Sequence, residues 1–189
     1  MIELAHMDAL RIGGRWMGGS QAWYRRFWHR QSGCGPTNAA LLVWYLARTR
    51  SEYAGLCDTG ARSKDDFLRV MDAMFRCVTP GFRGVHSPAK FIRGVEAYAE
   101  VRGTDLSLTV LEPEQIAPAL QKDLPVAFLN LHSGNQRQLT HWHWMTIVAC
   151  EPGTMRARCC DGGRVLEFSL REWQATSRLG GSFVTLNQQ

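Results

Sequence analysis

The stretch Gly33-Cys34-Gly35-Pro36-Thr37-Asn38-Ala39-Ala40 decides the fold, because it opens an apolar run that continues through residues 41–47. The run lacks Gly and Pro and regains charge only at Arg48, so it predicts a largely buried helix over about residues 36–47. Pro36 suits a first helical turn, where its missing N–H group costs nothing. Cys34 is therefore expected beside the free N–H groups of the helix start, where a thiolate is favoured.

Glycines flank this cysteine on both sides. Because Gly33 and Gly35 carry no side chain, the sequence predicts that another peptide backbone can approach the Cys34 sulfur closely. The alternative interpretation is a buried structural cysteine at a glycine-rich helix start, since free cysteines often serve as small apolar residues.

The rest of the chain predicts helices first and strands afterwards. Ser63 followed by Asp65 and Asp66 is typical of a helix start, and Ser87-Pro88 begins a further helix that ends before Gly103. Strand patterns follow at residues 106–110, 125–131, 142–150, 155–160, 165–168 and 182–186, with short helices at 113–121 and 169–177. This order is typical of an α+β domain with antiparallel strands.

The 189 residues fit one globular domain, 1–189, in which residues 1–22 are a candidate N-terminal extension. No apolar stretch resembles a secretory signal or a membrane span, so a cytoplasmic protein without a membrane span is expected. Six cysteines without a C-x-x-C pair predict reduced thiols. The sequence carries no signal for the oligomeric state.

The formal net charge is +5, but the basic residues are dispersed along the chain. Only Arg25, Arg26 and Arg30 form a dense group, among the aromatic residues of segment 23–28. Because no nucleic-acid-binding motif accompanies this group, an amphipathic surface is favoured over a nucleic-acid partner.

Catalytic chemistry at a thiol needs a histidine to move the proton and a polar group to orient that histidine. His143 begins the apolar strand pattern 144–149. Asp161 lies at the tight turn that follows the next predicted strand, so neighbouring strands can bring the two side chains together. His141 is an alternative base, because residues two apart on a strand share a face. Zinc held by His141, His143, Cys159 and Cys160 is disfavoured, because the compact ligand pairs typical of zinc sites are missing from the sequence.

Together, Gly33-Cys34-Gly35-Pro36-Thr37 and the strand that starts at His143-Trp144 resemble the C39-like group of papain-like cysteine peptidases, from about residue 31 to residue 186. The resemblance implies a papain-like fold, in which the cysteine opens the central helix and the sheet supplies the base. It also implies Cys34 as nucleophile, His143 as base and Asp161 as orienting residue, with a thioacyl-enzyme intermediate on a peptide or protein substrate. No cofactor and no metal are expected.

Related enzymes hold an oxyanion-stabilising glutamine about six residues before the cysteine, but Trp28 stands there in this chain. Gln31, three residues before Cys34, is the candidate donor, together with the backbone N–H of Cys34. The same triad serves peptide hydrolysis, acyl transfer, transglutamination and deamidation, so the reaction subtype stays open. A catalytically silent papain-like module that binds a peptide or protein partner is the alternative function.

Overall fold

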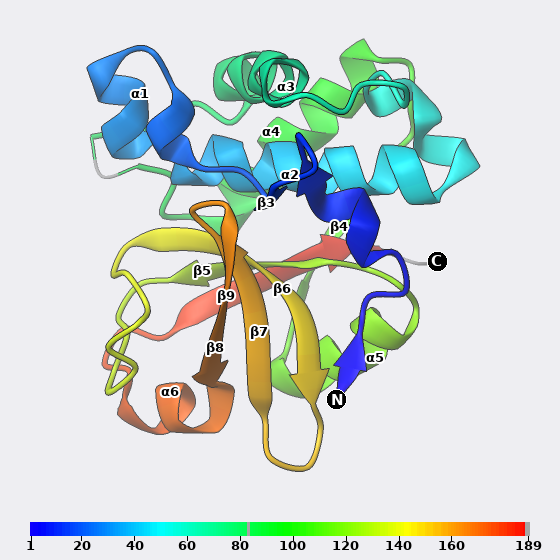
Figure 1. Cartoon of the computed structure of the whole chain (residues 1–189). Helices are drawn as coiled ribbons and strands as arrows, with labels where there is room; N and C mark the ends of the chain where they lie inside the picture. Colours follow the sequence, from blue (N-terminus) through cyan, green and yellow to red (C-terminus); the bar gives the residue numbers. More distant parts are fainter. Residues whose placement is uncertain (83, 188–189) are drawn as a thin grey trace.

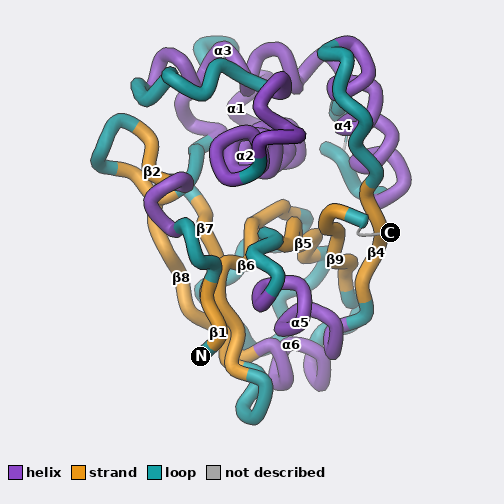
Figure 2. The backbone as a smooth tube through the Cα atoms, turned by 90° about the vertical axis from the view of Figure 1, so that its right-hand side faces the viewer, coloured by secondary structure: helices purple, strands orange, loops and turns teal. Residues whose placement is uncertain are grey.

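Four helices cover one face of an antiparallel sheet, and two short helices lie on its other side (Figures 1 and 2). The computed structural model describes residues 1–82 and 84–187. The covering helices are α1 (Phe27–Ser32), α2 (Cys34–Thr49), α3 (Lys64–Cys77) and α4 (Pro88–Val101). On the other side lie α5 (Ile116–Gln121) and α6 (Leu170–Thr176).

The sheet follows the order β4-β9-β5-β6-β7-β8. Strand β1 pairs with Ala149 and Cys150 of β6, beyond the residues of β6 that pair with β5. The strands are β1 (Ile2–Glu3), β4 (Leu108–Leu111), β5 (Val126–Asn130), β6 (His143–Glu151), β7 (Arg156–Asp161), β8 (Arg164–Ser169) and β9 (Gly181–Leu186). All of these pairings are antiparallel. The predicted α+β order, with helices before an antiparallel sheet, is therefore confirmed.

Helix α2 runs through the middle of the molecule, between the sheet and the other helices (Figure 2). Every residue from 34 to 47 is buried, which is the environment that a predominantly apolar helix requires. On the α3 side, the Trp44 ring meets Phe67 edge to face, with centroids 5.2 Å apart. The helix starts two residues before the predicted start, so Cys34 is its first residue.

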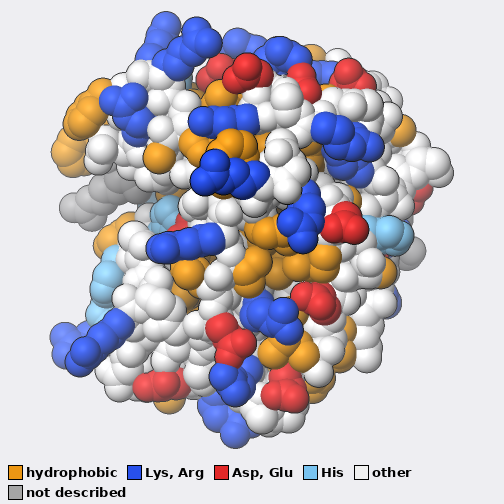
Figure 3. Space-filling model, in the orientation of Figure 1, with side chains coloured by type: hydrophobic (Ala, Val, Ile, Leu, Met, Phe, Trp, Pro, Cys, Tyr) orange, Lys and Arg blue, Asp and Glu red, His pale blue; other side chains and the backbone are white. Residues whose placement is uncertain are grey.

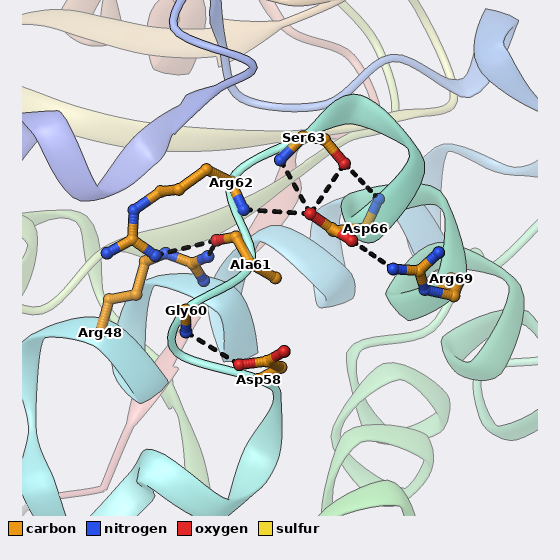
Figure 4. Close-up of polar contacts among 8 residues, drawn as sticks. All are labelled: Arg48, Asp58, Gly60, Ala61, Arg62, Ser63, Asp66 and Arg69. Atoms are coloured by element: carbon orange, nitrogen blue, oxygen red, sulfur yellow. Dashed lines mark hydrogen bonds and ion pairs between the residues drawn. The ribbon is translucent and has the colours of Figure 1, made fainter.

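Helix α3 begins with a reciprocal cap (Figure 4). The Asp66 carboxylate accepts hydrogen bonds from the Ser63 N–H at 2.9 Å and the Arg62 N–H at 3.1 Å, and the Asp66 N–H donates to Ser63 Oγ at 3.1 Å. Arg69 pairs with the same carboxylate one turn later. The N-cap predicted at Ser63 is confirmed, and the cap satisfies N–H groups that the helix itself leaves free.

Residues 1–22 contribute to the core. Leu10 and Ile12 are fully buried, and β1 pairs with the far end of β6. The Asp123 carboxylate accepts a hydrogen bond from the Ala5 N–H at 2.7 Å and contacts His6 Nδ1 at 2.6 Å. The segment considered as an extension therefore pairs with the sheet at its start and contributes Leu10 and Ile12 to the core. Among the described residues, no helix is both long and apolar enough to cross a membrane.

Candidate active site

Cys34 lies at the start of the 16-residue helix α2, directly after the N-cap residue Gly33. Its side chain is buried, with 7% of the residue exposed. Backbone hydrogen bonds from Gly35 and Trp144 reach the sulfur. The thiol therefore meets both the free N–H groups of a helix start and the backbone of Trp144, the second residue of β6.

The glycines beside Cys34 serve packing inside the protein. A Cβ atom on Gly33 would lie 2.3 Å from the His29 carbonyl oxygen and 2.5 Å from the Tyr24 ring, and one on Gly35 would lie 2.9 Å from Val85. The missing side chains at Gly33 and Gly35 thus allow close contacts within the protein itself. The chain's own α1 and the segment at Val85 already fill that space.

His143 and Asp161 meet at one end of the sheet. His143 is the first residue of β6 and Asp161 the last residue of the adjacent strand β7. His143 Nε2 lies 2.7 Å from Asp161 Oδ1, and the two side chains are 13% and 21% exposed. This contact leaves Nδ1 as the ring nitrogen available to Cys34, whose side chain hydrogen-bonds to His143. The structure thus brings together the three residues predicted from the sequence, with His143 between Cys34 and Asp161.

The surroundings of Cys34 and His143 stabilise opposite charges on the two groups. Burial raises the pKa of the Cys34 thiol, but the hydrogen bond and charge of His143 and the two backbone hydrogen bonds outweigh it, so the pKa is lowered. Burial likewise lowers the pKa of His143, but its hydrogen bonds to Asp161 and Cys34 outweigh it and raise the pKa to about 10. These directions favour a thiolate beside an imidazolium at neutral pH.

The pKa values of four other cysteines are shifted in the opposite direction, upward. Burial raises the pKa of Cys57, Cys150 and Cys159, and it raises the pKa of Cys160, which also faces the Asp161 charge, to about 12. All six cysteines lie in the described part of the chain and are unpaired. Cys34 therefore differs from these four in its charge environment, since it has a histidine partner.

His141, the alternative base, and Gln31, the candidate oxyanion donor, line a pocket with Cys34 but do not take part in the contact between His143 and Asp161. His141 is exposed in the loop before β6, where its ring packs edge to face on His132 at 4.9 Å between centroids. Gln31 is exposed on α1. Both line a pocket of about 600 Å³ that reaches Cys34.

Gln21 is a site residue that sequence reasoning missed. It belongs to the short 3-10 helix η2 (Gln21–Trp23) and lines a narrow pocket of about 40 Å³ together with Cys34, His143 and Asp161. Its Nε2 donates a hydrogen bond to the Arg30 carbonyl oxygen at 2.8 Å, and its Oε1 is buried without a partner. Gln21 lies 13 positions before Cys34, and helix α1 between them turns the chain back, which a count of residues does not reveal.

Within residues 1–82 and 84–187, His, Cys, Asp and Glu side chains form no group of three or more that could hold a metal ion. No protein-family model matches the chain, and no curated protein matches it significantly.

Proposed function

We propose that this protein is a papain-like cysteine peptidase or a closely related thiol acyl-transfer enzyme, with Cys34 as nucleophile, His143 as base and acid, and Asp161 as the residue that orients His143. The observation that supports it most is the 2.7 Å contact of His143 with Asp161 while the same ring also bonds the Cys34 thiol. A nucleophile, a base and an orienting group in contact are what this chemistry requires.

In the proposed reaction, the Cys34 thiolate attacks the carbonyl carbon of an amide and forms a carbon–sulfur bond. The carbonyl electrons move onto oxygen and return as the carbon–nitrogen bond breaks, while the His143 imidazolium gives its proton to the leaving amine. Water then loses a proton to His143 and attacks the thioester, which releases the acid and restores the thiolate. An amine in place of water gives a new amide, so hydrolysis and acyl transfer share every step up to the thioester.

Developing charge on the carbonyl oxygen needs hydrogen-bond donors. The backbone N–H of Cys34 at the start of α2 is one candidate donor. Gln31 remains a candidate from the sequence, and Gln21 joins it because Gln21 borders the same narrow pocket as the three proposed catalytic residues. Comparing Gln21→Ala with Gln31→Ala assigns the role: the variant that slows acylation by roughly 10²- to 10³-fold identifies the donor.

An activated ester tests the proposal without knowledge of the natural substrate. Wild-type protein and the Cys34→Ser and Cys57→Ser variants are mixed with p-nitrophenyl acetate, and intact mass and peptide mapping locate the acetyl group. We expect a burst of p-nitrophenol and acetylation at Cys34 in the wild type and in Cys57→Ser, and neither in Cys34→Ser. Acylation that survives Cys34→Ser, or no burst in the wild type, would contradict an enzyme and favour a silent binding module.

A further inference from the structure

One pocket gives access to the Cys34 sulfur from a side that the catalytic contacts do not occupy. Its volume is about 600 Å³, and its lining includes Cys34 but not His143 or Asp161. The narrow pocket that contains all three residues holds only about 40 Å³. Of these two pockets, the larger has room for a substrate side chain near Cys34. We call it the aromatic pocket, and its described lining is Trp28, Gln31, Ser32, Cys34, Phe82, Gly84, His141 and Trp142.

The aromatic pocket gathers exposed aromatic side chains. Trp28, Phe82 and Trp142 are 46%, 91% and 44% exposed, and they are three of the eight large apolar side chains exposed among the described residues. In Figure 3, apolar side chains gather at the edge of the molecule over α1, the helix that carries Trp28. Such clusters on a soluble surface usually mark a binding site.

The charge of the aromatic pocket differs from that of the rest of the molecule. The chain carries 22 Lys and Arg residues, and these spread over both layers in Figure 3. None of the described residues that line the pocket is Asp, Glu, Lys or Arg. An apolar group placed there would gain contact with the aromatic rings of Trp28, Phe82 and Trp142.

The backbone at Trp142 is held in a conformation that L-residues rarely adopt, with φ of 54°. Two other non-glycine residues in the described part of the chain share this conformation: Asp123, whose side chain binds the N-terminal segment, and Met155, whose N–H donates to the Glu151 carbonyl oxygen in the β6–β7 turn. Trp142 instead exposes almost half of its surface directly before His143. Strain of this kind is found mainly where function requires a side chain in one place.

The walls of the pocket are fixed to the elements that carry the catalytic residues. Trp144 of β6 donates its indole N–H to the Val85 carbonyl oxygen, and its ring stacks on Phe91 of α4 at 4.2 Å between centroids. Gly81 and Gly84 exchange two backbone hydrogen bonds of 3.0 Å, which shape the turn that carries Phe82. These contacts connect the segment at Gly84 and Val85 to β6, the strand that begins at His143.

We propose that the aromatic pocket binds an apolar side chain, preferably an aromatic one, of the peptide whose acyl group is transferred to Cys34, and that Trp28 and Trp142 set this preference. The inference rests on the proposed function, because it names the substrate class of the same nucleophile. Peptides with an acidic, basic or glycine residue in this position are the poorer substrates.

A set of activated esters tests the inference. N-acetylated p-nitrophenyl esters of Phe, Leu, Gly, Glu and Lys are compared for the rate at which each acylates Cys34, measured by intact mass. We expect Phe and Leu esters to react faster than Gly, Glu and Lys esters by about 10- to 100-fold. Trp142→Ala and, separately, Trp28→Ala should reduce the Phe-to-Gly ratio by about 10-fold, and Trp142→Phe should restore most of it.

Phe27→Ala is the matched control, because Phe27 is an exposed aromatic neighbour of Trp28, at 69%, but does not line the pocket. The Phe-to-Gly ratio should be unchanged in this variant. Urea unfolding midpoints identify any tryptophan variant that fails to fold, and the other tryptophan then carries the test.

Iodoacetamide alkylation of the wild type separates the two claims, since this reagent has no side chain to bind. Rapid alkylation of Cys34 with equal acylation by all five esters would overturn the aromatic pocket and leave the proposed function standing. A Phe-to-Gly ratio that stays at the wild-type value in both tryptophan variants would also overturn the aromatic pocket. Slow alkylation of Cys34 would overturn the proposed function itself.

Discussion

At His143, two opposing effects act on one imidazole ring. Burial lowers its pKa, whereas hydrogen bonds to Asp161 and Cys34 raise the pKa to about 10. The ring therefore keeps its proton through neutral pH and stabilises the negative charge on Cys34, whose pKa is lowered. The charged pair persists from the lowered pKa of Cys34 up to about pH 10.

Removing the histidine ring should slow the reaction of Cys34 with iodoacetamide. In His143→Ala the thiol loses its partner and stays buried, so its pKa rises and little thiolate remains at pH 7. We expect alkylation of Cys34 to slow by about 10- to 100-fold at pH 7, measured by quantitative mass mapping. His86→Ala is the matched control, because His86 is exposed and lines neither pocket at Cys34. Cys77 in the same sample is the internal reference. Equal alkylation rates in wild type and His143→Ala would contradict the pairing.

The role of Asp161 should appear on the alkaline side of the pH profile. Because its hydrogen bond raises the pKa of His143, Asp161→Asn should lower that pKa, so the imidazolium is lost at a lower pH. The alkaline limb of Cys34 acylation, near pH 10 in the wild type, should move down by roughly 1–2 pH units. A variant that only lowers the plateau rate, with both limbs unchanged, would show that Asp161 does not act through His143.

Helix α1 illustrates why an element can escape prediction from the sequence. It has six residues, Phe27–Ser32, too few for an apolar period to be recognised. Its position comes from tertiary contacts: the His29 ring stacks on Phe75 of α3 at 3.8 Å between centroids, and Gly33 brings the helix end against α2. By contrast, α3 and α4 carry N-cap residues and long apolar periods, so their starts could be predicted from local sequence.

The close junction of α1 and α2 predicts a stability defect at Gly33. In Gly33→Ala the new methyl group would lie 2.3 Å from the His29 carbonyl oxygen, so α1 must shift. We expect the free energy of unfolding in urea to fall by about 1–3 kcal/mol. Gly153→Ala is the matched control, because nothing lies within 4 Å of a Cβ atom there. If both variants unfold at the same urea concentration as wild type, the packing described at Gly33 is wrong.

At the scale of the whole molecule, distant parts of the chain pair in one sheet: β1 near the N-terminus pairs with β6 in the C-terminal half. The sequence predicted the order of helices and strands because that order depends on local periodicity. It did not predict that residues 1–22 join the core, because a two-residue strand leaves no period and its pairing depends on residues more than 140 positions away. Gln21 escaped for the same reason, since only the folded chain brings it to Cys34.

Leu10 tests whether the N-terminal segment stabilises the whole fold. Its side chain is fully buried, so Leu10→Ala should leave a cavity and lower the free energy of unfolding by about 2–5 kcal/mol. Leu179→Ala should change it by less than about 0.5 kcal/mol, because Leu179 is 56% exposed. Urea unfolding followed by tryptophan fluorescence compares the two. A Leu10→Ala protein as stable as Leu179→Ala would mean that residues 1–22 do not belong to the core.

The ionisation of Cys34 tests the central claim most directly. Thiolate absorbance in the ultraviolet is titrated in wild type and in Cys34→Ser, and the difference between the two curves reports Cys34 alone. The lowered pKa of Cys34 predicts that its thiolate forms at a lower pH than that of an ordinary thiol. A difference that appears only above about pH 8.5, as for an ordinary thiol, would contradict the thiolate–imidazolium pair and the function built on it.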